Sequence, residues 1–164
     1  MTLLEQIDYM RKLTCQAGVH SIRVLYAKAG TRLSAARIAD NDTLIDTKAY
    51  WAPVHTVDEA NYLVAVINSA AVLAKVTDLQ PRGEVTPRDF DNLVWTLPIP
   101  EYDPADTLHR DLAAAATRAE AVAATVPLTD AQHFIAKRRA IRAALAEDGI
   151  AAEMEALVDA LLPP

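Results

Sequence analysis

The first third of the chain alternates between hydrophobic and polar residues in short runs, a pattern typical of β-strands. Residues 21–27 alternate and include β-branched side chains, residues 31–39 follow after a short turn, and residues 43–54 continue the extended pattern. The turn between the first two runs contains Gly30, which can adopt the positive φ that a hairpin turn requires. These runs predict three short antiparallel strands.

Two other stretches of the first hundred residues have apolar residues at helical spacing. Residues 3–13 have this spacing, although residues 7–9 fit an extended chain equally well. Residues 58–75 begin with two acidic residues, which suit a helix start, and then repeat apolar residues every three or four positions. Residues 80–87 contain two prolines and a glycine, which predicts a loop, and residues 94–97 predict a last strand.

The remainder of the chain has helical spacing and is rich in alanine. Helices are predicted over residues 107–125, 130–147 and 150–162, with breaks at Pro127 and Gly149. The change of composition near residue 103 divides the chain in two. Residues 1–102 are expected to form an α+β domain, and residues 103–164 a helical segment that packs on this domain or on a partner. The predicted fold is α+β, with a small antiparallel sheet packed on a helix and a C-terminal helical segment.

Composition restricts the class of protein further. The chain has 164 residues, of which 52% are hydrophobic and 23% charged, as in a folded domain with a real core. The single cysteine, Cys15, excludes an internal disulfide and a cysteine zinc site. No apolar run approaches the ~18 residues of a membrane span, and residues 1–12 mix charged and apolar residues unlike a signal peptide. We therefore expect a cytoplasmic protein.

The net charge of −6 argues against nucleic-acid binding by the chain as a whole, but it is unevenly distributed. Residues 1–40 contain six basic and three acidic residues, residues 41–100 four and eight, and residues 101–164 six and eleven. Affinity for DNA depends on local contacts with phosphates rather than on total charge. A basic face on the first part of the chain is therefore compatible with DNA binding.

The sequence lacks the patterns of common catalytic sites. Four scattered glycines form no phosphate-binding loop, four histidines lack metal-ligand spacing, and no G-x-S-x-G elbow occurs. The aspartates that could form carboxylate pairs lie at predicted turns or helix starts, where capping is expected; they are Asp46, Asp58, Asp103 and Asp106. We expect no catalytic activity from this chain by itself and no cofactor.

Five segments occur in order between Ile22 and Pro100 and together resemble a known family. They comprise residues 23–31, 45–51, 58–69 and 80–83, and finally Arg88-Asp-Phe followed by Leu97-Pro-Ile-Pro. In this order they resemble the C-terminal target-recognition region of adenine-specific DNA methyltransferases of restriction–modification and phage-defence systems. More remotely, they are similar to the specificity subunits of multisubunit restriction enzymes. In the family a catalytic domain precedes this region, whereas here only Met1 and a short segment do.

The resemblance implies a module that holds duplex DNA against a catalytic domain and reads base edges. Basic side chains would contact phosphates, an outward aromatic ring would stack or pack, and a glycine would let the backbone approach the DNA closely. The candidate DNA-binding residues are Arg23, Lys28, Arg32, Lys48, Trp51, Arg82, Gly83 and Arg88. The implied partners are duplex DNA and a methyltransferase, helicase or nuclease domain of the same system.

Two alternatives to this function stay open at the level of sequence. One is a protein–protein interaction domain of such a system without direct contact to DNA, and the other is an enzyme of unrecognised type. DNA recognition requires the basic residues of 23–48 and 82–88 on one face. A second basic cluster, at residues 137–142, is a solvated helix face or a contact for phosphate or a partner. Whether the chain is a fragment or a stand-alone protein also stays open.

Overall fold

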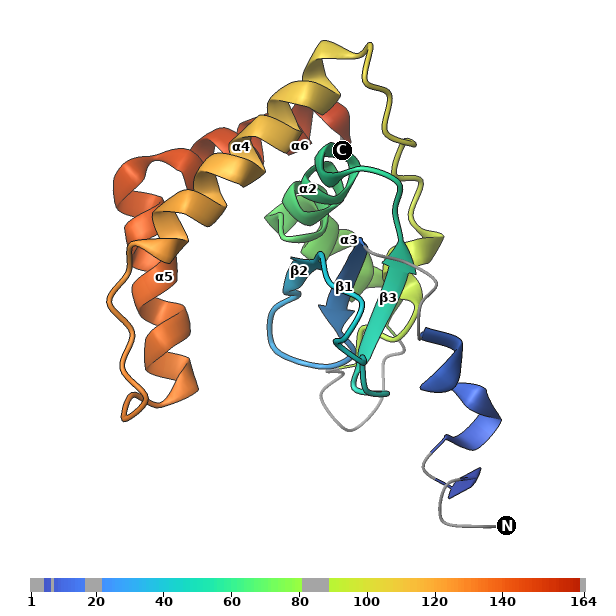
Figure 1. The fold of residues 1–164 in the computed structure, drawn as a ribbon. Helices are drawn as coiled ribbons and strands as arrows, with labels where there is room; N and C mark the ends of the chain where they lie inside the picture. The colour runs from blue at the N-terminus through green and yellow to red at the C-terminus, as the bar shows by residue number, and fades with distance from the viewer. Residues whose placement is uncertain (1–4, 7, 17–21, 81–88, 163–164) are drawn as a thin grey trace.

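The computed structural model describes residues 5–6, 8–16, 22–80 and 89–162 of the chain. Within these residues, a three-stranded sheet is followed by five α-helices (Figure 1). The strands are β1 (Arg23–Ala27), β2 (Ala35–Ile38) and β3 (Ala49–Pro53). The helices are α2 (Val57–Ile67), α3 (Ala70–Leu79), α4 (Thr107–Ala124), α5 (Phe134–Asp148) and α6 (Ile150–Leu161). The predicted α+β class is confirmed.

The sheet is antiparallel, with β1 in the centre and β2 and β3 at its edges. Leu25 of β1 lies opposite Ala36 of β2 and Trp51 of β3 in this register. All three strands lie within the predicted extended runs but are shorter than these runs. Successive side chains of β1 point to opposite faces of the sheet. Val24 and Tyr26 therefore lie on the same face, and both are buried in the core.

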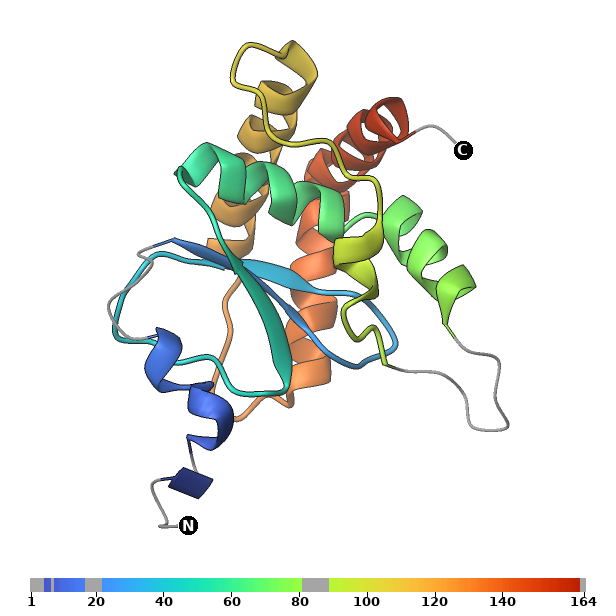
Figure 2. The ribbon, with the colours of Figure 1, turned by 90° about the vertical axis from the view of Figure 1, so that its right-hand side faces the viewer.

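Helix α2 packs against the sheet and also against α4 and α6, as Figures 1 and 2 show. Tyr26 of β1, Tyr62 and Val66 of α2, Leu112 of α4 and Val158 of α6 are all fully buried and belong to one hydrophobic core. The C-terminal helical segment therefore packs on the rest of the chain through α4 and α6.

Two predicted elements of the first hundred residues differ from the structure. The helix predicted over residues 58–75 is interrupted, because Asn68 ends α2 and Ser69 begins α3. The Asn68 side chain bonds both backbone groups of Ala35 in β2, at 2.8 and 3.0 Å, which fixes the break against the sheet edge. The strand predicted over residues 94–97 is wrong, since Leu93–Thr96 form a 3-10 helix, η3, that ends before Pro98.

The N-terminal segment is not the predicted continuous helix in its described part. Residues 5 and 6 are helical, and two 3-10 helices follow, η1 (Tyr9–Arg11) and η2 (Thr14–Gln16). The buried Gln16 side chain exchanges two hydrogen bonds of 2.8 Å with the backbone of Ile45. This exchange attaches the N-terminal segment to the loop before β3.

The three C-terminal helices follow the predicted breaks. Asp106 caps α4, and Gly149 ends α5 with a φ of 90°, in the left-handed region that favours glycine. Helix α5 begins at Phe134, later than the predicted start at residue 130, because His133 is its N-cap. Pro127 lies between α4 and α5, as expected from its sequence position.

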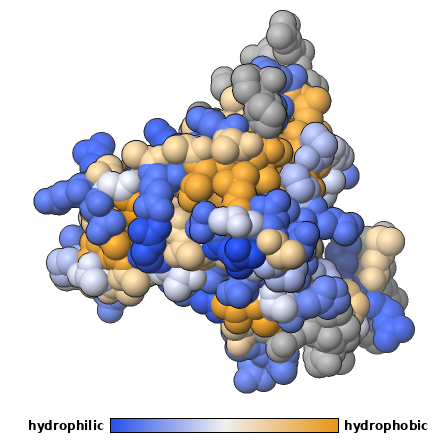
Figure 3. Space-filling model, turned by 90° about the horizontal axis from the view of Figure 1, so that it is seen from above, coloured by the Kyte–Doolittle hydropathy of each residue, from blue (hydrophilic) through white to orange (hydrophobic). Residues whose placement is uncertain are grey.

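On the face seen from above, hydrophilic side chains separate the hydrophobic surface into several patches (Figure 3). Among the described residues, no single helix is long and apolar enough to cross a membrane. Helices α2 and α3 reach that length and composition only when taken together across a 64° bend.

Candidate functional site

Three segments meet at the end of the sheet where β1 finishes and β3 begins. The Lys28 amide donates to the Lys48 carbonyl at 2.9 Å, and the Phe90 amide donates to the Lys28 carbonyl at 2.7 Å. Ala29 and Asp89 form an isolated antiparallel bridge. We call residues 28–32, 48 and 89–91 the sheet end. Their backbone contacts bring together segments that lie up to about sixty positions apart in sequence.

The sheet end carries three of the basic residues that the sequence singled out. Arg32 and Lys48 are exposed, and the Lys28 side chain is 41% exposed. Gly30 lies close to its neighbours, since a Cβ added there would meet the Arg32 carbonyl oxygen at 3.3 Å and the Phe90 ring at 3.8 Å. The Phe90 ring is buried beneath this turn and holds it in place.

Asp91 contacts both Tyr50 and Lys28 at the sheet end. Its backbone has a φ of 45°, and its carbonyl accepts a hydrogen bond of 2.7 Å from the buried Tyr26 hydroxyl. Its carboxylate accepts a hydrogen bond from the Tyr50 hydroxyl and lies 3.6 Å from the Lys28 ammonium. The Tyr50 hydrogen bond, assisted by Lys28, holds the pKa of Asp91 below its ordinary value. Lys28 is therefore partly neutralised, whereas no described acidic side chain forms an ion pair with Arg32 or Lys48.

Arg23 is not available for contact with DNA, contrary to the prediction, because its side chain is fully buried. Its guanidinium donates to the carbonyls of Asp40 and Thr43, each at 2.8 Å, and fastens the loop after β2. Within the described residues its Nε and Nη1 atoms make no hydrogen bond. Arg23 also lies at the opposite end of β1 from Lys28. A phosphate cannot reach a guanidinium in this position.

Trp51 is half-buried and lies away from the sheet end, beside the buried guanidinium. Its ring centroid is 5.9 Å from the Arg23 guanidinium carbon, within the range of a cation–π contact. Tyr50 faces the other side of the sheet, where its ring stacks on Tyr26 at 5.7 Å between centroids. The two rings therefore lie on opposite faces of the sheet, and a DNA contact by Trp51 stays a prediction.

Arg82, Gly83 and Arg88 lie outside the described residues. The residues that flank this segment are fixed at the sheet end, since the buried Gln80 side chain donates to the Asp89 carbonyl at 2.8 Å. Gln80, Phe90 and Asp91 were not among the site residues predicted from the sequence. Gln80 and Phe90 lie in two of the segments that carry the resemblance, which was the available signal.

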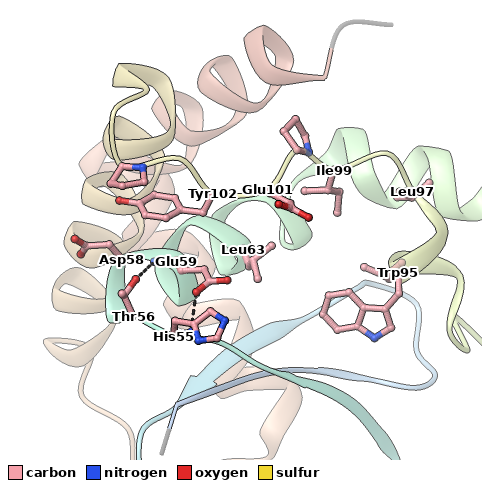
Figure 4. A pocket seen from close by; sticks show the side chains of 13 residues that line it. His55, Thr56, Asp58, Glu59, Leu63, Trp95, Leu97, Ile99, Glu101 and Tyr102 are labelled. Carbon is pink, nitrogen blue, oxygen red and sulfur yellow. Dashed lines mark hydrogen bonds between the residues drawn. The ribbon is translucent and has the colours of Figure 1, made fainter. Parts of the chain in front are cut away.

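A second feature is a groove of about 680 Å³ between the start of α2 and residues 94–104 (Figure 4). Leu63 lies at its centre, with Glu101 on one side and His55 on the other, and Trp95 at one end. At the start of α2 the Thr56 hydroxyl accepts the Glu59 amide at 3.1 Å, and the Glu59 carboxylate accepts the His55 amide at 2.7 Å. Asp58 and Glu101 are exposed acidic residues in the lining.

The described lining of the groove combines apolar side chains with acidic ones. Tyr62 beneath it donates to the Pro100 carbonyl at 2.9 Å, and burial raises its pKa to about 12. Among the described residues, no group of three or more histidine, cysteine or acidic side chains is placed to hold a metal ion. No nucleophile is hydrogen-bonded to a base among the described lining residues.

Comparison with known proteins adds no relative. The chain matches no family model, no curated protein and no solved structure.

Replacing Arg23 by alanine is expected to reduce the free energy of unfolding by about 2–4 kcal/mol. The substitution leaves two backbone carbonyls without their donor and opens a cavity under the loop after β2. Urea denaturation measures the effect, and the exposed Arg32→Ala variant serves as a control with a change within about 0.5 kcal/mol. Equal stability of the two variants would contradict the structural role of Arg23.

Replacing Tyr50 by phenylalanine is expected to raise the pKa of Asp91 towards its ordinary value. Because the folded-state pKa of Asp91 is lowered, its contribution to stability is complete above about pH 4 and is lost as the pH falls. Tyr50→Phe should therefore flatten the acid dependence of stability. Carboxyl carbon NMR measures the pKa, and Tyr102→Phe, whose hydroxyl does not contact Asp91, should leave it unchanged. An unaltered Asp91 titration in Tyr50→Phe would refute this assignment.

Proposed function

We propose that the chain is a DNA-binding target-recognition module of a restriction–modification or phage-defence adenine DNA methyltransferase. The observation that carries the proposal is the sheet end, where Lys28, Arg32 and Lys48 meet the anchored flanks of the segment that contains Arg82, Gly83 and Arg88. The resemblance of residues 23–100 to such modules supports the same function.

In this function the exposed basic side chains position the module on the DNA, and the segment that contains Gly83 recognises the base sequence. Arg32, Lys48 and the partly neutralised Lys28 contact phosphates of the duplex, which fixes the orientation of the module. Arg82 and Arg88 remain predicted contacts with base edges, where a guanidinium can bond a guanine in two places. Gly83 allows the backbone to approach the DNA closely.

Catalysis belongs to a partner domain in this proposal. Adenine methylation in a duplex requires the base to be turned out into a catalytic pocket, and the module holds the DNA while this happens. The partner is a methyltransferase, helicase or nuclease domain of the same cytoplasmic system, and this chain needs no cofactor. Since the chain has a net charge of −6, its own affinity is expected to be weak, in the range ~10⁻⁴ to 10⁻⁶ M that is typical of non-specific binding.

A second candidate function, a protein–protein interaction domain without DNA contact, is favoured by the groove. Its apolar residues Leu63, Leu97 and Ile99 lie beside the exposed carboxylates of Asp58 and Glu101. Such a lining suits a basic and apolar segment of a partner protein. The two candidates use different surfaces, so substitutions at the sheet end and in the groove separate them.

Replacing Lys28 and Lys48 together by alanine is expected to weaken binding to every duplex sequence by roughly tenfold at 50 mM salt. The slope of log affinity against log salt should become shallower by about 1–2, as expected for the loss of one or two phosphate contacts. Fluorescence anisotropy at several salt concentrations measures both quantities.

The matched control is Lys75→Ala with Arg118→Ala, which removes the same charge from α3 and α4. This variant should bind as the unmodified chain does. If both double variants lose affinity equally, the effect is one of total charge, and the sheet end is not the interface.

A further inference from the structure

Helix α5 has no acidic residue in its first turn and no basic residue in its last turn. Residues 131–146 contain four basic residues and no acidic residue, and the carboxylates Glu147 and Asp148 follow at the C-terminal end. A helix is stabilised by the reverse arrangement, with acidic residues near its start and basic residues near its end. Arg142 also lies three and four positions from Arg139 and Arg138, where like charges repel. The helix therefore presents a concentration of positive charge that intrinsic helix stability does not favour.

These cations lack the partners that the other basic residues of the C-terminal segment have. Arg118 forms an ion pair with Glu153, and Arg110 donates to the carbonyls of Pro104 and Ala105. Within the described part of the chain, Lys137, Arg138, Arg139 and Arg142 form no ion pair or hydrogen bond. Arg138 contacts only a ring, with its guanidinium carbon 5.6 Å from the centroid of Phe134.

Helical geometry gathers the three arginines on the outer face of α5. The half-buried residues Ala140, Ile141, Ala144 and Leu145 form its inner side, and α5 packs on α4 and α6. At 3.6 residues per turn, Arg138, Arg139 and Arg142 fall within an arc of about 100° on the opposite side. All three are exposed. Their charges thus point to solvent in one direction.

We propose that Arg138, Arg139 and Arg142 form a second contact with the phosphate backbone of duplex DNA. This inference rests on the proposed function, because it assigns a second surface to the same ligand. Guanidinium groups match phosphate oxygens in geometry, and a phosphate row neutralises charges that the chain leaves uncompensated. The start of α5 and the turn of the sheet end both lie on the lower side of the molecule in Figures 1 and 2.

DNA fits this face better than a lipid surface does. A helix that lies on a membrane needs a wide apolar stripe beside its cations. Here the apolar stripe that contains Ile141 and Leu145 is turned inward, and the large exposed apolar residues of α5 are Phe134 and Ile135 in its first turn. The rest of the outer face is mainly arginine and alanine.

The test compares three forms of the full chain with a fluorescein-labelled 20-base-pair duplex at several salt concentrations. Arg138→Ala/Arg139→Ala/Arg142→Ala is expected to bind about tenfold or more weakly, with a salt slope shallower by about 2–3. The charge-conserving Arg138→Lys/Arg139→Lys/Arg142→Lys variant should keep most of that slope. Thermal unfolding of all three forms shows that the helix is retained, and the lysine variant gives a result even if the alanine variant does not fold.

The outcomes distinguish this inference from the proposed function. If the Lys28/Lys48 variant loses salt slope and the arginine-to-alanine variant does not, the α5 contact is refuted and the proposed interface stands. If the arginine-to-alanine variant loses it and the Lys28/Lys48 variant does not, α5 is the contact and the sheet end is refuted. If the unmodified chain binds no duplex, both proposals fail. Arginine-dependent binding to phosphatidylserine vesicles, or arginine-dependent dimerisation without DNA binding, overturns the α5 proposal in favour of a lipid or a second copy.

Discussion

Tyr26 joins the segments from which the sheet end is built. Its ring is fully buried, stacks on Tyr50 and lies 5.3 Å between centroids from Trp95, while its hydroxyl donates to the Asp91 carbonyl. Burial raises the pKa of this hydroxyl far above its ordinary value, so it remains a donor throughout the physiological pH range. Without this bond, residues 89–91 keep their backbone contacts with Lys28 and Ala29 but lose a buried attachment to the centre of β1.

Local charge explains how an acidic chain can serve as a DNA-binding module in this account. Lys28, Arg32 and Lys48 gather at the sheet end, and three arginines gather on α5. Acidic residues elsewhere pair with other cations, as Glu120 does with Arg37, or cap helices, as Asp106 does. Phosphates sense charges within about a Debye length, roughly 8 Å at physiological salt, so these clusters matter more than the net charge.

The sequence predicted those features that depend on local periodicity and missed those that depend on distant segments. The three strands of the sheet, the breaks at Pro127 and Gly149, and the Asp106 cap follow from nearby residues. The burial of Arg23 does not, because it requires the carbonyls of Asp40 and Thr43 to fold over the strand. The break of α2 likewise depends on the contact of Asn68 with β2, and the groove combines residues far apart in sequence.

The most direct test of the central claim is an NMR titration of the ¹⁵N-labelled chain with a short duplex. Amide shifts are expected to concentrate at residues 28–32, residue 48 and residues 138–142, and to diminish with added salt. Arg23 and the groove residues Leu63 and Trp95 should stay unchanged. Shifts confined to the groove, or none at low salt, would contradict DNA recognition by this chain.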